Sequence, residues 1–165
     1  MATSTRAKPP TPPRTRYEDD VYTWVLEQVA LLQAGRLNEV DALNIAEELA
    51  DVAKAEFRGL TSAIAMLTQH LLKWDHQPNR RSRSWELSVR EQRSRILEAI
   101  ADSPGLKSRL SDAIERGYRS GRNGALEETK LPDVAMPEAC PYSFDEMMTR
   151  PIVFEPKPAA RPKKR

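Results

Sequence analysis

Cysteine and histidine are scarce in this chain of 165 amino acids. The single cysteine, Cys140, excludes an internal disulfide and any cysteine-rich zinc site, and we expect it to be a packed structural residue. With only two histidines, His70 and His76, no Ser-His-Asp arrangement stands out. The glycines occur singly or at helical spacing, so the sequence has no glycine-rich phosphate loop. We therefore expect no bound cofactor.

Long apolar runs are also missing from the sequence. The longest segment without a formal charge covers 14 residues, 59–72, and five of them are polar. A helix that spans a bilayer needs about 20 mostly apolar residues. No apolar segment follows Met1, so the sequence shows no secretory signal. The lone cysteine suits a reducing compartment, and we expect a soluble, cytoplasmic protein with no membrane partner.

Basic charge is concentrated at the two ends of the chain. Residues 1–16 hold four basic groups and no acid, and residues 155–165 hold five basic groups against one acid. Both segments are rich in proline, and we expect them to be disordered arms. Residues 17–154, which we expect to form a single helical domain, hold 17 basic groups against 23 acidic ones. Nucleic-acid affinity is therefore poorly supported for this domain, although the arms could contact RNA or an acidic partner.

The hydrophobic pattern between the two arms is helical. The segment DDVYTWVLEQVALLQAG places five apolar residues on one stripe, namely Tyr22, Val25, Leu26, Val29 and Leu32. Gly35 is a natural stop for this first helix, and Asp41 is a natural N-cap for the second. The second helix is a proline-free run that reaches about Asp75. Gly59 is the only position inside it where a glycine could let the helix bend.

Two further helices and a strap follow Pro78, which ends the second helix. A third helix begins near Ser82 or Ser84, and Ser103 caps a fourth. The fourth helix carries small residues close to a seven-residue repeat, which predicts tight packing of another backbone: Gly117, Gly121 and Ala125. Ser143 and Glu146 form a capping box for one short helix in a proline-punctuated C-terminal strap. We therefore predict an all-α fold, a four-helix bundle-like domain with a long second helix and this strap.

Several spaced motifs in the chain resemble those of the bacterial DUF29 family. In order they are NIAEELADV (44–52), HLLKW followed by QP (70–78), RSRSW followed by REQR (81–93), EET followed by LP (127–132) and CPYSFDEMM (140–148). The resemblance covers nearly everything between the two arms. It implies an all-helical bacterial domain, and it carries over no catalytic residue because the family has no assigned activity.

Four residues could form a metal-assisted enzymatic site. Glu47, Glu48 and Asp51 lie close together on the second helix, and carboxylates with the imidazole of His70 suit a divalent metal. His70 follows Glu47 by 23 residues, about 34 Å along a straight helix, so they meet only if the helix folds back near Gly59 or a second chain supplies one of them. We favour the alternative, in which the carboxylates are solvated or paired and His70 packs in the core.

The arginines between Arg80 and Arg95, including Arg81 and Arg83, form the second candidate cluster. With Trp74 and Trp85 nearby, they could bind phosphates and stack on nucleic-acid bases. Their helical positions do not form one stripe, and acids alternate with them. This pattern indicates pairing within the chain and a solvated face, so nucleic-acid association remains an alternative that depends mainly on the basic arms.

The segment HLLKWDHQPNRRSRSW is best interpreted as a corner between two helices. Trp74 and Trp85 bracket the turn and pack into the core, and Pro78 enforces the end of the helix. The small residues of the fourth helix and the long second helix favour helix–helix contacts beyond one chain. The sequence therefore predicts a non-enzymatic protein-interaction or self-association module with no identifiable small-molecule ligand. The two alternatives are the nucleic-acid and metal-enzyme functions.

Overall fold

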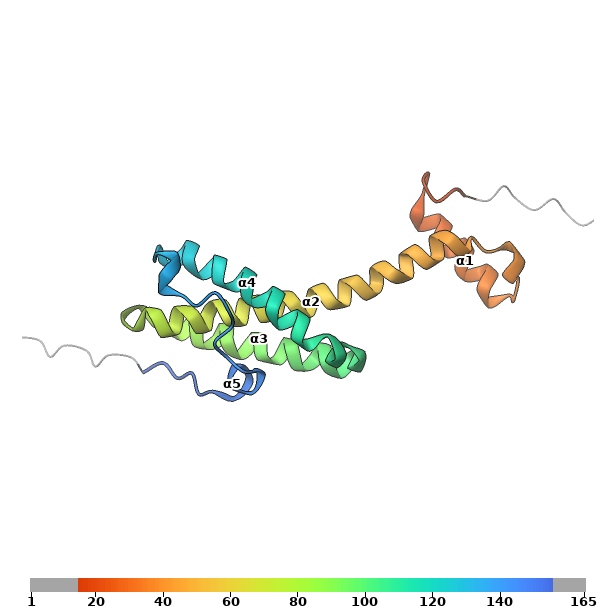
Figure 1. The fold of residues 1–165 in the computed structure, drawn as a ribbon. Coiled ribbons are helices and arrows are strands. Elements are labelled where there is room, and N and C mark those ends of the chain that lie inside the picture. The colour runs from red at the N-terminus through yellow and green to blue at the C-terminus, as the bar shows by residue number, and fades with distance from the viewer. Residues whose placement is uncertain (1–14, 156–165) are drawn as a thin grey trace, which may run out of the picture. The chain divides into compact units, whose positions relative to one another are not determined.

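The computed structural model describes residues 15–155, so most of the two arms that we predict to be disordered, 1–16 and 155–165, lies outside this range. Within it every regular element is helical and no strand occurs (Figure 1), which confirms the predicted all-α fold. The contacts divide the chain into two compact units, Met1–Asp51 and Val52–Arg165, called here the N-terminal unit and the C-terminal unit. The assignment of residues 17–154 to one domain stays a prediction.

The described elements comprise α-helices and short 3₁₀ segments. The α-helices are α1 (Val21–Gln33), α2 (Ala42–His76), α3 (Arg83–Asp102), α4 (Leu110–Thr129) and α5 (Phe144–Thr149). The 3₁₀ segments are η1 (Leu37–Glu39), η2 (Pro78–Arg80), η3 (Pro104–Arg109) and η4 (Asp133–Ala135).

The N-terminal unit consists of α1, η1 and the beginning of α2. The carboxylate of Asp20 caps α1 by accepting hydrogen bonds from the backbone N–H and the hydroxyl of Thr23. Gly35 follows α1 with φ of 69°, the left-handed conformation that glycine adopts readily after a helix. Asp41 accepts the backbone N–H of Asn44 at 3.3 Å and so caps α2. Both Gly35 and Asp41 therefore act as the sequence predicts.

One side of α1 is buried within the N-terminal unit. Trp24, Gln28 and Leu31 are its buried residues. The ring of Tyr17 packs edge-on against the ring of Trp24, with ring centres 4.9 Å apart. The amide oxygen of Gln28 accepts the backbone N–H of Asp41 at 2.8 Å, which explains why a polar side chain is buried here.

Helix α2 contains no proline and passes through Gly59 without interruption. It ends two residues before Pro78, which opens the 3₁₀ turn η2, so the predicted stop is confirmed. An apolar stripe along its C-terminal half is buried: Leu60, Ile64, Leu67, Leu71 and Trp74.

In the C-terminal unit, α3 and α4 lie alongside this part of α2 (Figure 1). The hydroxyl of Ser82 accepts the backbone N–H of Trp85 and caps α3, which decides between the two predicted starts of this helix. The core of the unit also takes residues from α3, α4 and the C-terminal strap, among them Val89, Ile96, Ala113, Met147 and Ile152. Burial of this apolar stripe against three other segments is what holds the unit together.

The small residues of α4 allow this helix to pack closely on α2. A Cβ atom on Gly121 would lie 2.4 Å from the backbone oxygen of Ala65, and one on Gly117 would lie 2.9 Å from the backbone oxygen of Thr61. Ala125 is fully buried. The close backbone approach predicted from the sequence is therefore present. It occurs within one chain, so this ridge does not support a contact with a partner, contrary to our interpretation of the sequence.

The fourth helix starts later than the sequence predicts. After α3, the segment η3 forms a 3₁₀ structure in which the backbone N–H of Leu106 bonds to the oxygen of Ser103 at 3.0 Å. This tighter winding turns Leu106 into the core, and α4 begins only at Leu110. The side chain of Ser103 makes no capping hydrogen bond to η3. The capping box of Ser143 and Glu146 is present at the start of α5.

Candidate functional site

The candidate carboxylates and the candidate histidine lie in different units. Glu48 accepts a hydrogen bond of 2.6 Å from the hydroxyl of Tyr17 inside the N-terminal unit, and this bond raises the pKa of the tyrosine. Glu47 and Asp51 are exposed on the same part of α2, whereas His70 is buried in the C-terminal unit. Among the described residues, no group of three histidine, cysteine, aspartate or glutamate side chains could hold a metal ion.

His70 is 9% exposed, and its Nδ1 atom has no hydrogen-bond partner. Burial lowers the pKa of His70, and the positive charge of Lys73 lowers it further, while the carboxylate of Glu128 opposes the change. The imidazole is therefore held neutral near pH 7. The sequence identifies this residue as a candidate, and the structure gives it a packed position with one unsatisfied polar atom.

Lys73 is a buried cation that connects all three long helices of the C-terminal unit. It is only 5% exposed, and its ammonium group pairs with the carboxylate of Glu128 on α4. The same ammonium lies 4.5 Å from the ring centre of Trp85 on α3. Gln69 donates a hydrogen bond of 2.7 Å to the other oxygen of Glu128. This polar group is well satisfied, so it fixes how α3 and α4 sit on α2.

The buried His70 makes stability depend on pH. Below pH 6.5 the unfolded chain binds a proton at this residue that the folded chain resists, so folding loses stability as the pH falls. We expect the free energy of unfolding to decrease from pH 7 to pH 5 by at most about 1.4 kcal/mol per pH unit from this group. Urea unfolding at each pH measures it. His70→Leu should reduce the dependence of the free energy of unfolding on pH. The exposed control His76→Gln should not have this effect.

Helices α2 and α3 are joined by a short corner that contains η2. Trp74 is buried in the core, and Pro78 is exposed in η2. Arg81 donates a hydrogen bond of 2.9 Å from Nε to the backbone oxygen of Trp74, and its guanidinium lies 5.0 Å from the ring centre of the same residue. Trp85 is half-buried under Lys73. Arg81 therefore connects the end of the corner to the last turns of α2.

Two other arginines of this region, Arg83 and Arg93, bind within the chain. Arg83 pairs with Glu86 at 2.5 Å, one turn along α3. Arg93, half-buried, donates hydrogen bonds to the backbone oxygens of Met147 and Arg150 in the strap. The alternation of charges along α3 accounts for the pair of Arg83 with Glu86, whereas Arg93 binds backbone oxygens of the strap.

The contact that holds the strap on α2 joins residues far apart in the sequence. Arg150 binds Asp75 with both terminal nitrogens, and the hydroxyl of Tyr142 donates to the same carboxylate at 2.8 Å. Burial alone would raise the pKa of Asp75, but the hydrogen bonds from Arg150 and Tyr142 outweigh it and lower that pKa. Burial also raises the pKa of Tyr142. Asp75 and Arg150 are 75 positions apart, so no local motif could predict the pair.

Cys140 lies next to this contact and has the properties of a packed thiol. Its Sγ donates to the backbone oxygen of Tyr142 at 3.4 Å. Burial raises the pKa of the Cys140 thiol. A nucleophilic cysteine needs a lowered pKa. This position therefore agrees with the structural function expected for Cys140.

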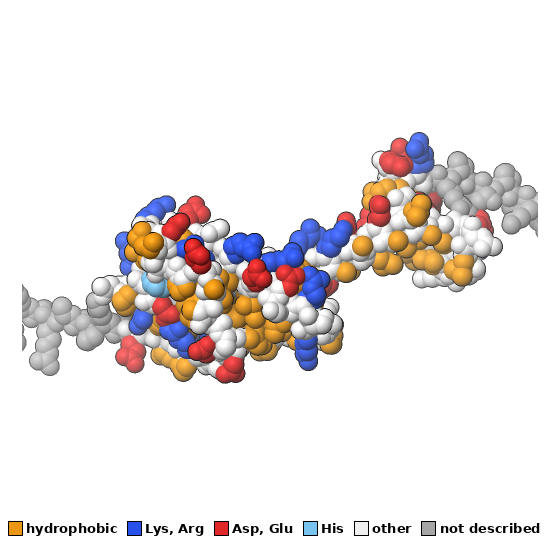
Figure 2. Space-filling view, in the orientation of Figure 1, with side chains coloured by type: hydrophobic (Ala, Val, Ile, Leu, Met, Phe, Trp, Pro, Cys, Tyr) orange, Lys and Arg blue, Asp and Glu red, His pale blue; other side chains and the backbone are white. Residues whose placement is uncertain are grey.

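The apolar stripe that the sequence predicts on α1 is exposed to solvent. We call the α1 face the set of exposed apolar side chains on this helix, which are Val21, Tyr22, Val25, Leu26, Val29 and Leu32. Tyr22 is 76% exposed. Figure 2 shows hydrophobic side chains gathered over the N-terminal unit, at the right of the view. The predicted apolar residues therefore share one side of α1, but no other described residue covers them fully.

Comparison with protein-family models matches residues 16–152 to the family described as a domain of unknown function, DUF29. The chain belongs to the DUF29 family. In this DUF29 chain the match includes all five α-helices found in residues 15–155. Comparisons with curated proteins and with solved structures gave no significant match. None of the helices in residues 15–155 is both long enough and apolar enough to cross a bilayer.

Two of the motifs that resemble DUF29 supply the buried polar contacts of the C-terminal unit. The segment HLLKW contributes His70, Lys73 and Trp74, and the segment CPYSFDEMM contributes Cys140 and Tyr142. These side chains face other parts of the same unit. In this DUF29 chain the two motifs therefore act in folding, whereas the side chains of the α1 face stay exposed among the described residues.

Proposed function

We propose that this DUF29 chain is a non-enzymatic helical module that self-associates through the α1 face. The observation that carries the proposal is the exposure of six large apolar side chains on one helix of 13 residues. Soluble monomers rarely expose such contiguous apolar surface, since covering it is favourable. That the protein is bacterial and cytoplasmic is part of the same proposal.

A second copy of the chain is the partner that suits the α1 face best. Residues Tyr22, Val25, Val29 and Leu32 follow the alternating spacing of three and four residues that forms a coiled-coil seam. Glu27 is the only charged residue of α1, and it accepts hydrogen bonds from Thr15. Two copies could therefore pack their α1 faces together about a two-fold axis without bringing like charges into contact.

Sedimentation equilibrium over a wide range of protein concentration tests this proposal. We expect wild-type protein to form dimers, and Val29→Glu to raise the dissociation constant about 100-fold or more because two carboxylates would be buried at the contact. Val29 is 43% exposed, so the substitution leaves the folded chain intact, and circular dichroism verifies this.

Ala30→Glu is the matched control for this experiment. Ala30 is the next residue along α1, exposed and outside the α1 face, and the substitution adds the same charge. We expect it to leave the dissociation constant unchanged. Wild-type protein that stays monomeric at every concentration would contradict the proposal, as would equal effects of the two variants.

A further inference from the structure

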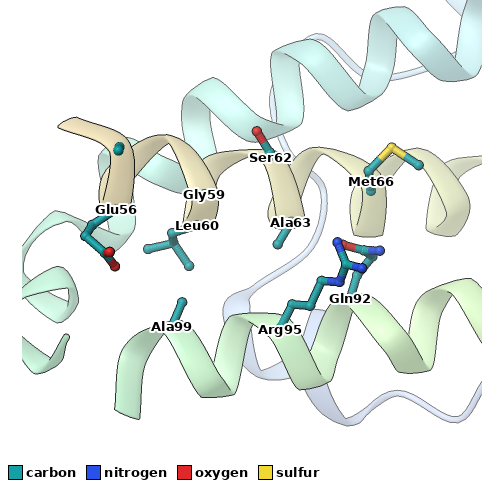
Figure 3. A pocket seen from close by; sticks show the side chains of 10 residues that line it. Glu56, Gly59, Leu60, Ser62, Ala63, Met66, Gln92, Arg95 and Ala99 are labelled. Atoms are coloured by element: carbon teal, nitrogen blue, oxygen red, sulfur yellow. The ribbon is translucent and has the colours of Figure 1, made fainter. Parts of the chain in front are cut away.

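A pocket of about 570 Å³ lies between α2 and α3, entirely within the C-terminal unit. Its floor is apolar and is formed by Leu60 and Ala63 of α2 with Ala99 of α3 (Figure 3). Pockets that bind small molecules in proteins have volumes in this range and combine an apolar lining with a few polar groups. The polar groups that line this pocket therefore decide which ligand it suits.

Gln92 places an unpartnered amide in the pocket. The residue is only 9% exposed, and no hydrogen bond within residues 15–155 involves its side chain. Figure 3 shows this side chain pointing from α3 toward α2, near Met66. Neither atom of this amide is closed off from solvent, so water in the pocket can hydrogen-bond to it. A ligand that accepts a hydrogen bond at this point would satisfy it.

Arg95 adds a positive charge at the same end of the pocket. Its Nε donates a hydrogen bond of 2.9 Å to Glu91, one turn earlier on α3, while its guanidinium points toward α2 (Figure 3). The pair with Glu91 is exposed, and pairs of this kind contribute little to stability. Gln92 and Arg95 lie three positions apart on α3 and both line the pocket, and a guanidinium and an amide N–H are suitable donors for a carboxylate.

The opposite end of the pocket carries a negative charge. Glu56 lines it there, and its carboxylate accepts a hydrogen bond of 3.4 Å from the hydroxyl of Ser103. A ligand with a second carboxylate at that end would be repelled. The distribution of charge therefore favours a molecule with one carboxylate, an apolar body and no anionic group at its far end.

We propose that the pocket between α2 and α3 is a binding site for a small apolar monocarboxylate. The carboxylate binds the Arg95 guanidinium and the Gln92 amide, and the apolar body lies on Leu60, Ala63 and Ala99. This site is separate from the α1 face, so the two proposals can fail independently.

Isothermal titration calorimetry on the full chain tests the site with three probes of similar length. We expect octanoate to bind, and octanol and octanedioate each to bind at least about tenfold more weakly. Octanol lacks the carboxylate, and octanedioate places a second carboxylate near Glu56. Equal affinity for octanoate and octanol, or no binding of octanoate, would overturn the proposal.

Three variants test whether the probe occupies this pocket. Gln92→Leu removes the amide but keeps the side-chain size, and Arg95→Gln removes an exposed charge, so both proteins should fold. We expect each to weaken octanoate binding about tenfold or more. Gly59→Leu adds a side chain at a position where a Cβ atom has open space, and it should block the pocket without a clash at the backbone.

Arg119→Gln is the matched control, because Arg119 also pairs with a glutamate one turn earlier on its own helix, at 3.0 Å from Glu115. We expect this variant to bind octanoate with wild-type affinity. If all four variants bind octanoate equally well, the probe is not in this pocket and the proposal is wrong.

Discussion

Trp74→Ala is expected to lower the free energy of unfolding by about 3–5 kcal/mol, the range typical of large-to-small changes in a core. Trp74 is 5% exposed and belongs to the main core cluster of the C-terminal unit. Its removal leaves a cavity, and Arg81 loses the ring on which its guanidinium lies. Urea unfolding followed by far-ultraviolet circular dichroism measures the change.

An exposed residue of α3 provides the comparison for this variant. Leu97 is 58% exposed, so Leu97→Ala should change the free energy of unfolding by less than about 1 kcal/mol. If Trp74→Ala were as stable as Leu97→Ala, the corner between α2 and α3 would not be a structural anchor. The function of this segment would then have to be sought in binding.

Gly121→Ala is expected to destabilise the protein by about 3 kcal/mol, although alanine is the better helix former. The added Cβ would lie 2.3 Å from the hydroxyl of Thr68 and 2.4 Å from the backbone oxygen of Ala65. The backbone oxygen cannot turn away as a side chain could. The helices α2 and α4 must therefore move apart, and the contacts along their whole interface weaken.

Gly59→Ala is the matched control, because Gly59 also lies inside a helix but a Cβ there would meet nothing within 4 Å. We expect this variant to be more stable than wild type by up to about 1 kcal/mol, the difference in helix propensity. Thermal unfolding of both variants measures the contrast. If both substitutions changed the stability of the protein in the same direction, the close approach of α4 to α2 would be wrong.

Local signals in the sequence predicted the ends of most helices correctly. Asp41, Ser82 and the capping box of Ser143 each act through a hydrogen bond to a backbone N–H within three residues. Pro78 prevents the helix from continuing, because its ring removes the backbone N–H and clashes with the preceding turn. Such effects depend on a few adjacent residues, and this is why sequence alone is enough to locate them.

Partners distant in sequence could not be predicted in the same way. The spacing of Gly117 and Gly121 indicates that a backbone packs there, but it does not tell whether the backbone belongs to α2 or to another chain. The pair of Asp75 and Arg150 depends on where the strap crosses α2. The apolar stripe of α1 likewise identifies a face and not the surface that covers it.

The candidate polar residues also differ in whether their partners are near or distant in the sequence. The sequence correctly indicated that the charges around Arg83 pair within the chain, since Glu86 lies one turn away. It did not indicate the burial of Lys73, whose partner Glu128 is 55 positions away. The pocket at Gln92 also went unpredicted, because its lining comes from two helices and its polar groups have no motif spacing.

Disulfide cross-linking at the centre of the α1 face is the most direct test of self-association. A chain with Cys140→Ser and Val29→Cys has a single thiol, and two such thiols can bond only if their Cβ atoms approach to about 4 Å. Ala30→Cys in the same background is the control. We predict that mild oxidation converts the Val29→Cys protein to covalent dimers and leaves the Ala30→Cys protein monomeric. Cross-linking of both variants to the same small extent would contradict self-association through the α1 face.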